Sequence, residues 1–100
     1  MKNFIKIVLL LCICVKAEAQ SSVLAVADSL YATGNYTKAI NQYAKTGNQK
    51  SGLQIARAYN AIGNYEKAII QYQKLIEVNP LMQIATFELG KLLVKTKDFD

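Results

Sequence analysis

The sequence predicts an all-α protein in which antiparallel helix pairs repeat and stack into an α-solenoid. Residues 34–43 (GNYTKAINQY) recur as residues 63–72 (GNYEKAIIQY), with eight of ten positions identical. Apolar residues follow each copy at helical spacing, and no segment alternates apolar and polar residues as a half-buried strand would. Self-similarity on this scale indicates helix pairs that bury their apolar faces against one another.

The spacing of the copies defines three units. Tyr65 and Phe99 are 34 residues apart, whereas Tyr36 and Tyr65 are only 29 apart. The shortfall falls at residues 46–48 (TGN), where the second copy continues as LIEVNP. We therefore expect the second helix of the first unit to end more than one turn early, at Gly47. The units are predicted at residues 20–48, 49–82 and 83–100, the last being incomplete.

Turn residues mark the helix boundaries within each unit. Gly34 and Gly63 are expected to end the first helix, and Asn35 and Asn64 to cap the second. Pro80 blocks continuation of the second helix of the middle unit. Helices are predicted near residues 21–32, 36–46, 50–61, 65–78 and 81–95, with a sixth beginning at Phe99.

The tyrosines fall mainly at positions that pack one helix on the next. An aromatic binding platform is the alternative, but the repeat places five of the six beside small residues of a neighbouring helix. Tyr31 falls on the opposite face and is predicted to be available for binding. The five expected packing tyrosines are Tyr36, Tyr43, Tyr59, Tyr65 and Tyr72.

The ordered residue set of the middle unit resembles the tetratricopeptide repeat family. The family has small residues and aromatics at fixed positions, a Gly-Asn-Tyr turn and a closing proline. The chain departs from it at Leu30 and Leu93, where an aromatic is preferred, and at Gly52, where a bulky residue is preferred. The resemblance implies a right-handed superhelix and a non-catalytic scaffold that binds a peptide or protein. The matching residues are Ala56, Tyr59, Gly63, Asn64, Tyr65, Ala68, Tyr72 and Pro80.

The first 19 residues read as a secretory signal peptide. Lys2 and Lys6 precede an unbroken apolar run over residues 7–15, and Ala17 and Ala19 are small residues suited to cleavage after Ala19. A membrane-spanning helix is the alternative, but nine apolar residues are about half of the ~20 that a bilayer core requires. We therefore expect an exported protein, periplasmic or secreted, without a membrane span once the signal is removed.

Removal of this segment limits the chemistry of the mature chain. Both cysteines, Cys12 and Cys14, leave with it, and the sequence has no histidine. The remaining carboxylates are not paired at helical spacing, so no catalytic dyad, metal or other cofactor is expected. The net charge falls from +5 to +3, and the scattered lysines do not form the basic stripe of a nucleic-acid-binding protein.

Function is expected on the concave wall, which the first helix of each unit lines. Its mixture of apolar anchors and cations suits a partner segment with acidic groups, although a merely solvated surface is the alternative. Two other readings stay open: a sensor or adaptor region of a larger membrane-bound signalling protein or enzyme that continues beyond Asp100, and self-association. The candidate groove residues are Leu24, Asp28, Tyr31, Lys50, Leu53, Arg57, Asn60, Ile84, Phe87, Lys91, Val94 and Lys95.

Overall fold

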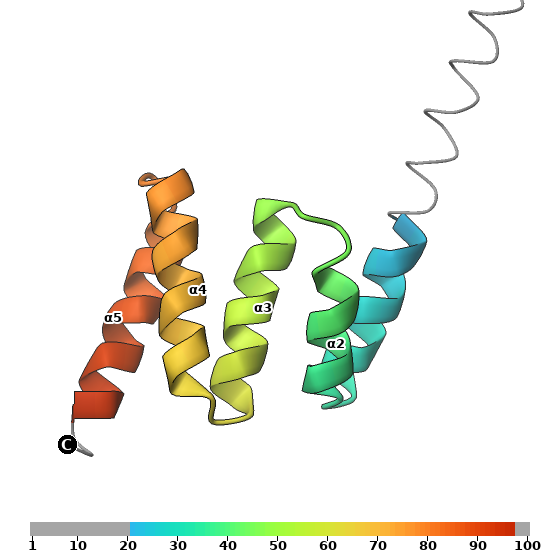
Figure 1. The fold of residues 1–100 in the computed structure, drawn as a ribbon, viewed down its shortest axis with the longest axis horizontal. Coiled ribbons are helices and arrows are strands. Elements are labelled where there is room, and N and C mark those ends of the chain that lie inside the picture. Colours follow the sequence, from blue (N-terminus) through green and yellow to red (C-terminus); the bar gives the residue numbers. More distant parts are fainter. Residues whose placement is uncertain (1–20, 98–100) are drawn as a thin grey trace, which may run out of the picture.

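The computed structural model describes residues 21–97, which form a row of helices in which neighbours run antiparallel (Figure 1). The predicted signal peptide and the helix expected at Phe99 lie outside these residues. Over residues 21–97 every regular element is a helix, which confirms the all-α prediction. The elements are a first helix over residues 21–32, α2 (Tyr36–Tyr43), α3 (Gln49–Ala61), α4 (Tyr65–Val78) and α5 (Gln83–Lys97).

The two Gly-Asn-Tyr copies make the same turn. Gly34 and Gly63 have φ angles of 83° and 80°, a left-handed conformation that side chains with a Cβ disfavour. The next backbone N–H reaches back to the preceding helix, since Asn35 N donates to Leu30 O at 2.8 Å and Asn64 N donates to Tyr59 O at 2.9 Å. This is the hydrogen-bond pattern of a glycine-terminated helix, and it confirms both glycines as helix stops.

The two asparagines of these turns behave differently. Asn64 Oδ1 accepts the backbone N–H of Lys67 at 3.3 Å and so caps α4 as predicted. Asn35 makes no side-chain cap on α2, and its Nδ2 donates to Thr33 Oγ1 at 3.0 Å. The first copy has Thr33 where the second has Ile62, so only the first copy offers a side-chain hydroxyl that the asparagine amide can donate to. The prediction that Asn35 caps α2 is therefore wrong.

The second helix of the first unit ends even earlier than predicted. α2 has 8 residues and α4 has 14, although both begin at equivalent tyrosines. The chain turns after Tyr43 because the Thr46 hydroxyl donates to the Tyr43 carbonyl at 2.8 Å, and Gly47 adopts a φ of 68°. α5 likewise begins at Gln83 instead of residue 81, since Asn79 Oδ1 accepts the Leu81 N–H at 3.2 Å in a turn that includes Pro80.

The core lies where small residues of one helix meet large residues of the next. Tyr43 and Tyr72 are each 1% exposed, and Ala56 and Ala68 are fully buried. Tyr59 and Tyr65 pack against the cluster that includes Tyr72, as predicted for the repeat. Contacts of this kind join α3 to α4 and α4 to α5, while Ala27, Ala39 and Tyr43 join the first helix to α2.

Tyr31 and Tyr36 form a half-buried pair. Their ring centroids are 5.3 Å apart and the rings are nearly perpendicular, a favourable edge-to-face geometry. Tyr31 also packs against the cluster around Ala27 and Tyr43. The expectation that Tyr31 stands free of the core therefore needs correction: its ring is partly committed to packing.

Candidate protein-binding groove

Three adjoining hollows run across the face formed by the first helix, α3 and α5. Their volumes are about 290, 570 and 630 Å³, and neighbouring hollows share Arg57, Asn60 or Ile84, so they form one continuous surface, here called the groove. The structure brings eleven of the twelve predicted groove residues together in it. These residues are Leu24, Asp28, Tyr31, Lys50, Leu53, Arg57, Asn60, Ile84, Phe87, Lys91 and Lys95.

Val94 is separated from the groove. It lies with Thr86 and Gly90 on a neighbouring face of α5, which shares only Phe87 and Lys91 with the groove. Val94 and Phe87 are each 66% exposed. Helical spacing groups Val94 with Lys91, three residues earlier, but the structure places Val94 beside Gly90 on the neighbouring face.

An ion pair crosses the middle of the groove from α3 to α5. The guanidinium of Arg57 meets the carboxylate of Glu88 in a two-pronged contact, with Nε 2.9 Å from Oε1. Arg57 Nη1 also donates to Gln54 Oε1 at 3.0 Å. Planar pairing of this kind is specific in geometry. Arg57 is therefore neutralised within the chain instead of being available to a partner.

Tyr72 completes this cluster from the core side. Its hydroxyl donates to Glu88 Oε1 at 2.8 Å. Burial raises the pKa of Tyr72 well above its ordinary value, and the hydrogen bond to Glu88 raises it further. The hydrogen bonds from Arg57, followed by the one from Tyr72, lower the pKa of Glu88 below its ordinary value despite partial burial. Glu88 is thus an anion fixed on the groove floor.

A second tyrosine–carboxylate contact lies in the first unit. The Tyr43 hydroxyl donates to Asp28 Oδ1 at 2.5 Å. Burial, and then the hydrogen bond to Asp28, raise the pKa of Tyr43 to about 12. Asp28 is therefore oriented by a core residue, and it supplies negative charge at the end of the groove nearest the first helix.

The opposite end of the groove is basic and aromatic. Lys91 Nζ lies 5.5 Å from the centroid of the Phe87 ring, and Lys95 Nζ lies 4.8 Å from that of Tyr65. Both lysines are exposed, and neither forms an ion pair among residues 21–97. Aromatic contact orients their stems while the ammonium groups remain in water. This end can accept a carboxylate beside an apolar side chain.

Asn60 adds a polar group where the hollows meet. Its Oδ1 is buried and has no hydrogen-bond partner within the described chain. Unpaired buried acceptors are costly and are usually satisfied by water or a ligand. An N–H donor on a bound segment would satisfy this oxygen.

Sequence reasoning missed the groups that organise the groove. Glu88 and the hydroxyls of Tyr43 and Tyr72 were not selected, yet they fix Arg57 and Asp28. The available signal was spacing: Glu88 follows Arg57 by 31 residues, one helical turn short of the 34-residue period. Within residues 21–97, no three Asp, Glu, His or Cys side chains gather in a way that could hold a metal ion.

Stacked antiparallel helix pairs with an open groove across their first helices define an α-helical repeat protein of the interaction class. A family model described as "Tetratricopeptide repeat" matches residues 53–80, from Leu53 in α3 to Pro80 just after α4. Residues 53–80 therefore form a tetratricopeptide repeat. A search of curated proteins found no match. No helix in the part described has the length and apolar character needed to cross a bilayer.

Proposed function

We propose that this protein is a non-catalytic scaffold whose groove holds a segment of a partner protein carrying acidic residues. Tetratricopeptide repeats are typically interaction modules, which sets the general class. The observation that supports this more specific role is the charge distribution of the groove. Arg57 is paired with Glu88, whereas Lys91 and Lys95 project unpaired beside the exposed ring of Phe87.

The geometry suggests how such a segment would be bound. An apolar side chain would cover Phe87 and Ile84, which are 66% and 48% exposed. A carboxylate one or two residues away would reach Lys91 or Lys95, and a backbone N–H would pair with the free acceptor of Asn60. Apolar contact would supply most of the affinity, and the lysines would contribute to specificity and to the association rate.

Reversal of the charges of Lys91 and Lys95 tests this proposal. The double substitution Lys91→Glu with Lys95→Glu should abolish co-purification of partners from the protein's own cells, while the helix content stays unchanged. The matched control is Lys38→Glu with Lys45→Glu, which makes the same charge change on exposed positions outside the groove. If both double variants lose partners equally, the loss is due to the change in net charge and not to the groove. If neither loses partners, the groove lysines have no role.

Arg57 is a poor target for this test. Its replacement by glutamate would place two carboxylates face to face and remove the guanidinium donors that Glu88 now has, so lost binding would reflect damage to the fold. Lys91 and Lys95 carry no such structural role.

We further propose that the scaffold acts after export. Cleavage after Ala19 would remove none of residues 21–97, which form the described helices. N-terminal sequencing of the protein isolated from its own cells should begin at Gln20, in a fraction outside the cytoplasm. Recovery with Met1 in the cytoplasm would refute export without touching the groove proposal.

A further inference from the structure

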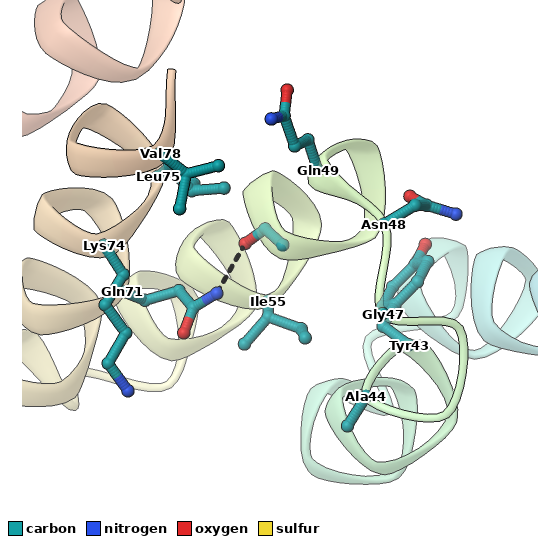
Figure 2. A pocket seen from close by; sticks show the side chains of 11 residues that line it. Tyr43, Ala44, Gly47, Asn48, Gln49, Ile55, Gln71, Lys74, Leu75 and Val78 are labelled. Carbon is teal, nitrogen blue, oxygen red and sulfur yellow. Dashed lines mark hydrogen bonds between the residues drawn. The ribbon is translucent and has the colours of Figure 1, made fainter. Parts of the chain in front are cut away.

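A second hollow lies on a different face of α3, between the ends of α2 and α4. Its volume is about 370 Å³ and it is mostly apolar (Figure 2). Ile55 of α3 forms its floor, Leu75 and Val78 of α4 form one wall, and Ala44 with Gly47 forms the other. We call this hollow the notch. It shares only Tyr43 with the groove.

The notch lies where α2 lacks the last part of the helix that α4 has. α2 and α4 start at equivalent tyrosines, but α2 stops six residues sooner, which is about 9 Å of helix. In the second unit those residues include Leu75, which is only 6% exposed and belongs to the core. The first unit has the polar Thr46 at the equivalent position. The apolar cover that the repeat normally provides is therefore absent beside Ile55.

The notch is held open by specific contacts. Thr46 Oγ1 lies 2.6 Å from Oγ of Ser51, a polar side chain that is 1% exposed. Asn48 Oδ1 accepts the Ser51 N–H at 2.7 Å and so caps α3. On the opposite side, Gln71 Nε2 donates to the Gly52 carbonyl at 3.3 Å and ties α4 to α3 (Figure 2). These hydrogen bonds preform the walls, so an occupant need not organise the site.

The lining defines the chemistry of the occupant. Lys74 is the one charged residue among those that line the notch, and no carboxylate accompanies it. Val78 is 70% exposed at the edge, so apolar surface continues outward from the hollow. In the second unit the residues that follow at the equivalent positions are Leu-Ile-Glu-Val at 75–78, which combine aliphatic side chains, Leu75 among them buried, with one acid.

We propose that the notch is a second protein-binding site, which takes one helical turn of a partner protein. An aliphatic side chain of that turn enters the space above Ile55, and an acidic residue beside it pairs with Lys74. The turn thus replaces part of the helix that α2 lacks. This site is separate from the groove and does not depend on what the groove binds.

A pair of defined peptides tests the proposal on the full chain. The probe is an acetylated, alanine-based helical peptide that carries Leu-Ile-Glu-Val, and its matched control carries Ala-Ala-Lys-Ala at the same positions. Methyl resonances of Ile55, Leu75 and Val78 should shift with the probe and stay unchanged with the control. The methyl resonances of Ile84 report on the groove, so binding of the probe there is distinguished from binding in the notch.

Two variants locate the binding. Ala44→Leu adds a side chain at an exposed wall position and should weaken probe binding by about tenfold or more, since it excludes roughly one aliphatic side chain from burial. Ala32→Leu makes the same change at an exposed position of the first helix and should have no effect. Circular dichroism confirms that both variants fold.

Three results would overturn the proposal. The probe and control peptides could shift the notch methyl groups equally, or not at all. The small apolar alcohol cyclohexanol could shift them when the probe does not, which would make the notch a small-molecule site. The same resonances could move on dilution of the protein alone, in which case a second copy of the chain is the occupant.

Discussion

Two glycines inside helices give opposite predictions for the same substitution. Gly90 lies within α5, and a Cβ added there would meet no atom within 4 Å. Because glycine costs a helix interior about 0.5–1 kcal/mol relative to alanine, Gly90→Ala should stabilise the protein by that amount. Gly52 lies within α3, where an added Cβ would come within 2.8 Å of Leu75 Cδ2. Gly52→Ala gains the same backbone preference but must displace a buried leucine.

Overpacking of this kind typically costs about 1–3 kcal/mol, so Gly52→Ala should be neutral to destabilising by about 2 kcal/mol. The two variants should therefore differ by about 1–3 kcal/mol, or roughly 5–20 °C in melting temperature for a domain of this size. Thermal and urea unfolding followed by circular dichroism would measure the difference. Equal stabilisation by both substitutions would show that Leu75 gives way freely, and that the close approach of α3 and α4 is not set by Gly52.

The remaining predictions concern hydrogen bonds to polar side chains. Glu88→Gln should cost about 1–2 kcal/mol at neutral pH, after discount for partial exposure. The pKa of Glu88 in the folded protein is lowered from 4.5, so the stability that its carboxylate contributes is fully present above pH 4.5 and is lost as the pH falls below that value. Glu88→Gln should therefore lose less stability than the unaltered protein on acid titration. The pKa of Tyr43 in the folded protein is raised from 10 to about 12, so the stability that its protonated hydroxyl contributes is fully present below pH 10 and is lost as the pH rises through about 12. Tyr43→Phe should remove this loss of stability from the alkaline unfolding profile. Asn48→Ala should cost about 0.5–2 kcal/mol in urea unfolding, whereas Asn35→Ala should cost less because that side chain caps no helix.

Local signals in the sequence predict the order of the helices over residues 21–97 and most of the residues that pack between them. Gly34 and Gly63 end helices because a left-handed residue is needed there, and that requirement is visible in one sequence. Tyr43 and Tyr72 are buried because each meets a small residue supplied by the repeat. The end of α2 was less predictable, since the hydrogen bond from Thr46 to the Tyr43 carbonyl competes with one more turn of helix.

The sequence predicts which residues line the candidate groove, but not which of their charges are paired. Helical spacing selects the face of α3 that carries Leu53 and Arg57, because facing direction depends only on the 100° step between residues. Whether Arg57 is free depends on the vertical offset between α3 and α5, which determines that Glu88 stands opposite it. That offset arises from packing across α4, and no local pattern encodes it.

The first unit has a shortened second helix, α2, and the helices nevertheless remain stacked. Ala39 and Tyr43, the residues that pack α2 against the first helix, lie before the point where the chain turns away. The last turns that α2 lacks would come after Tyr43. Their absence therefore leaves Ile55 less covered but does not expose the cluster around Ala27. Asn48 caps the start of α3 by accepting the Ser51 N–H, at the place where the second unit has Asn79-Pro80. The 29-residue spacing is therefore compatible with the same packing as the 34-residue spacing, and its structural consequence is confined to one exposed apolar hollow beside Lys74.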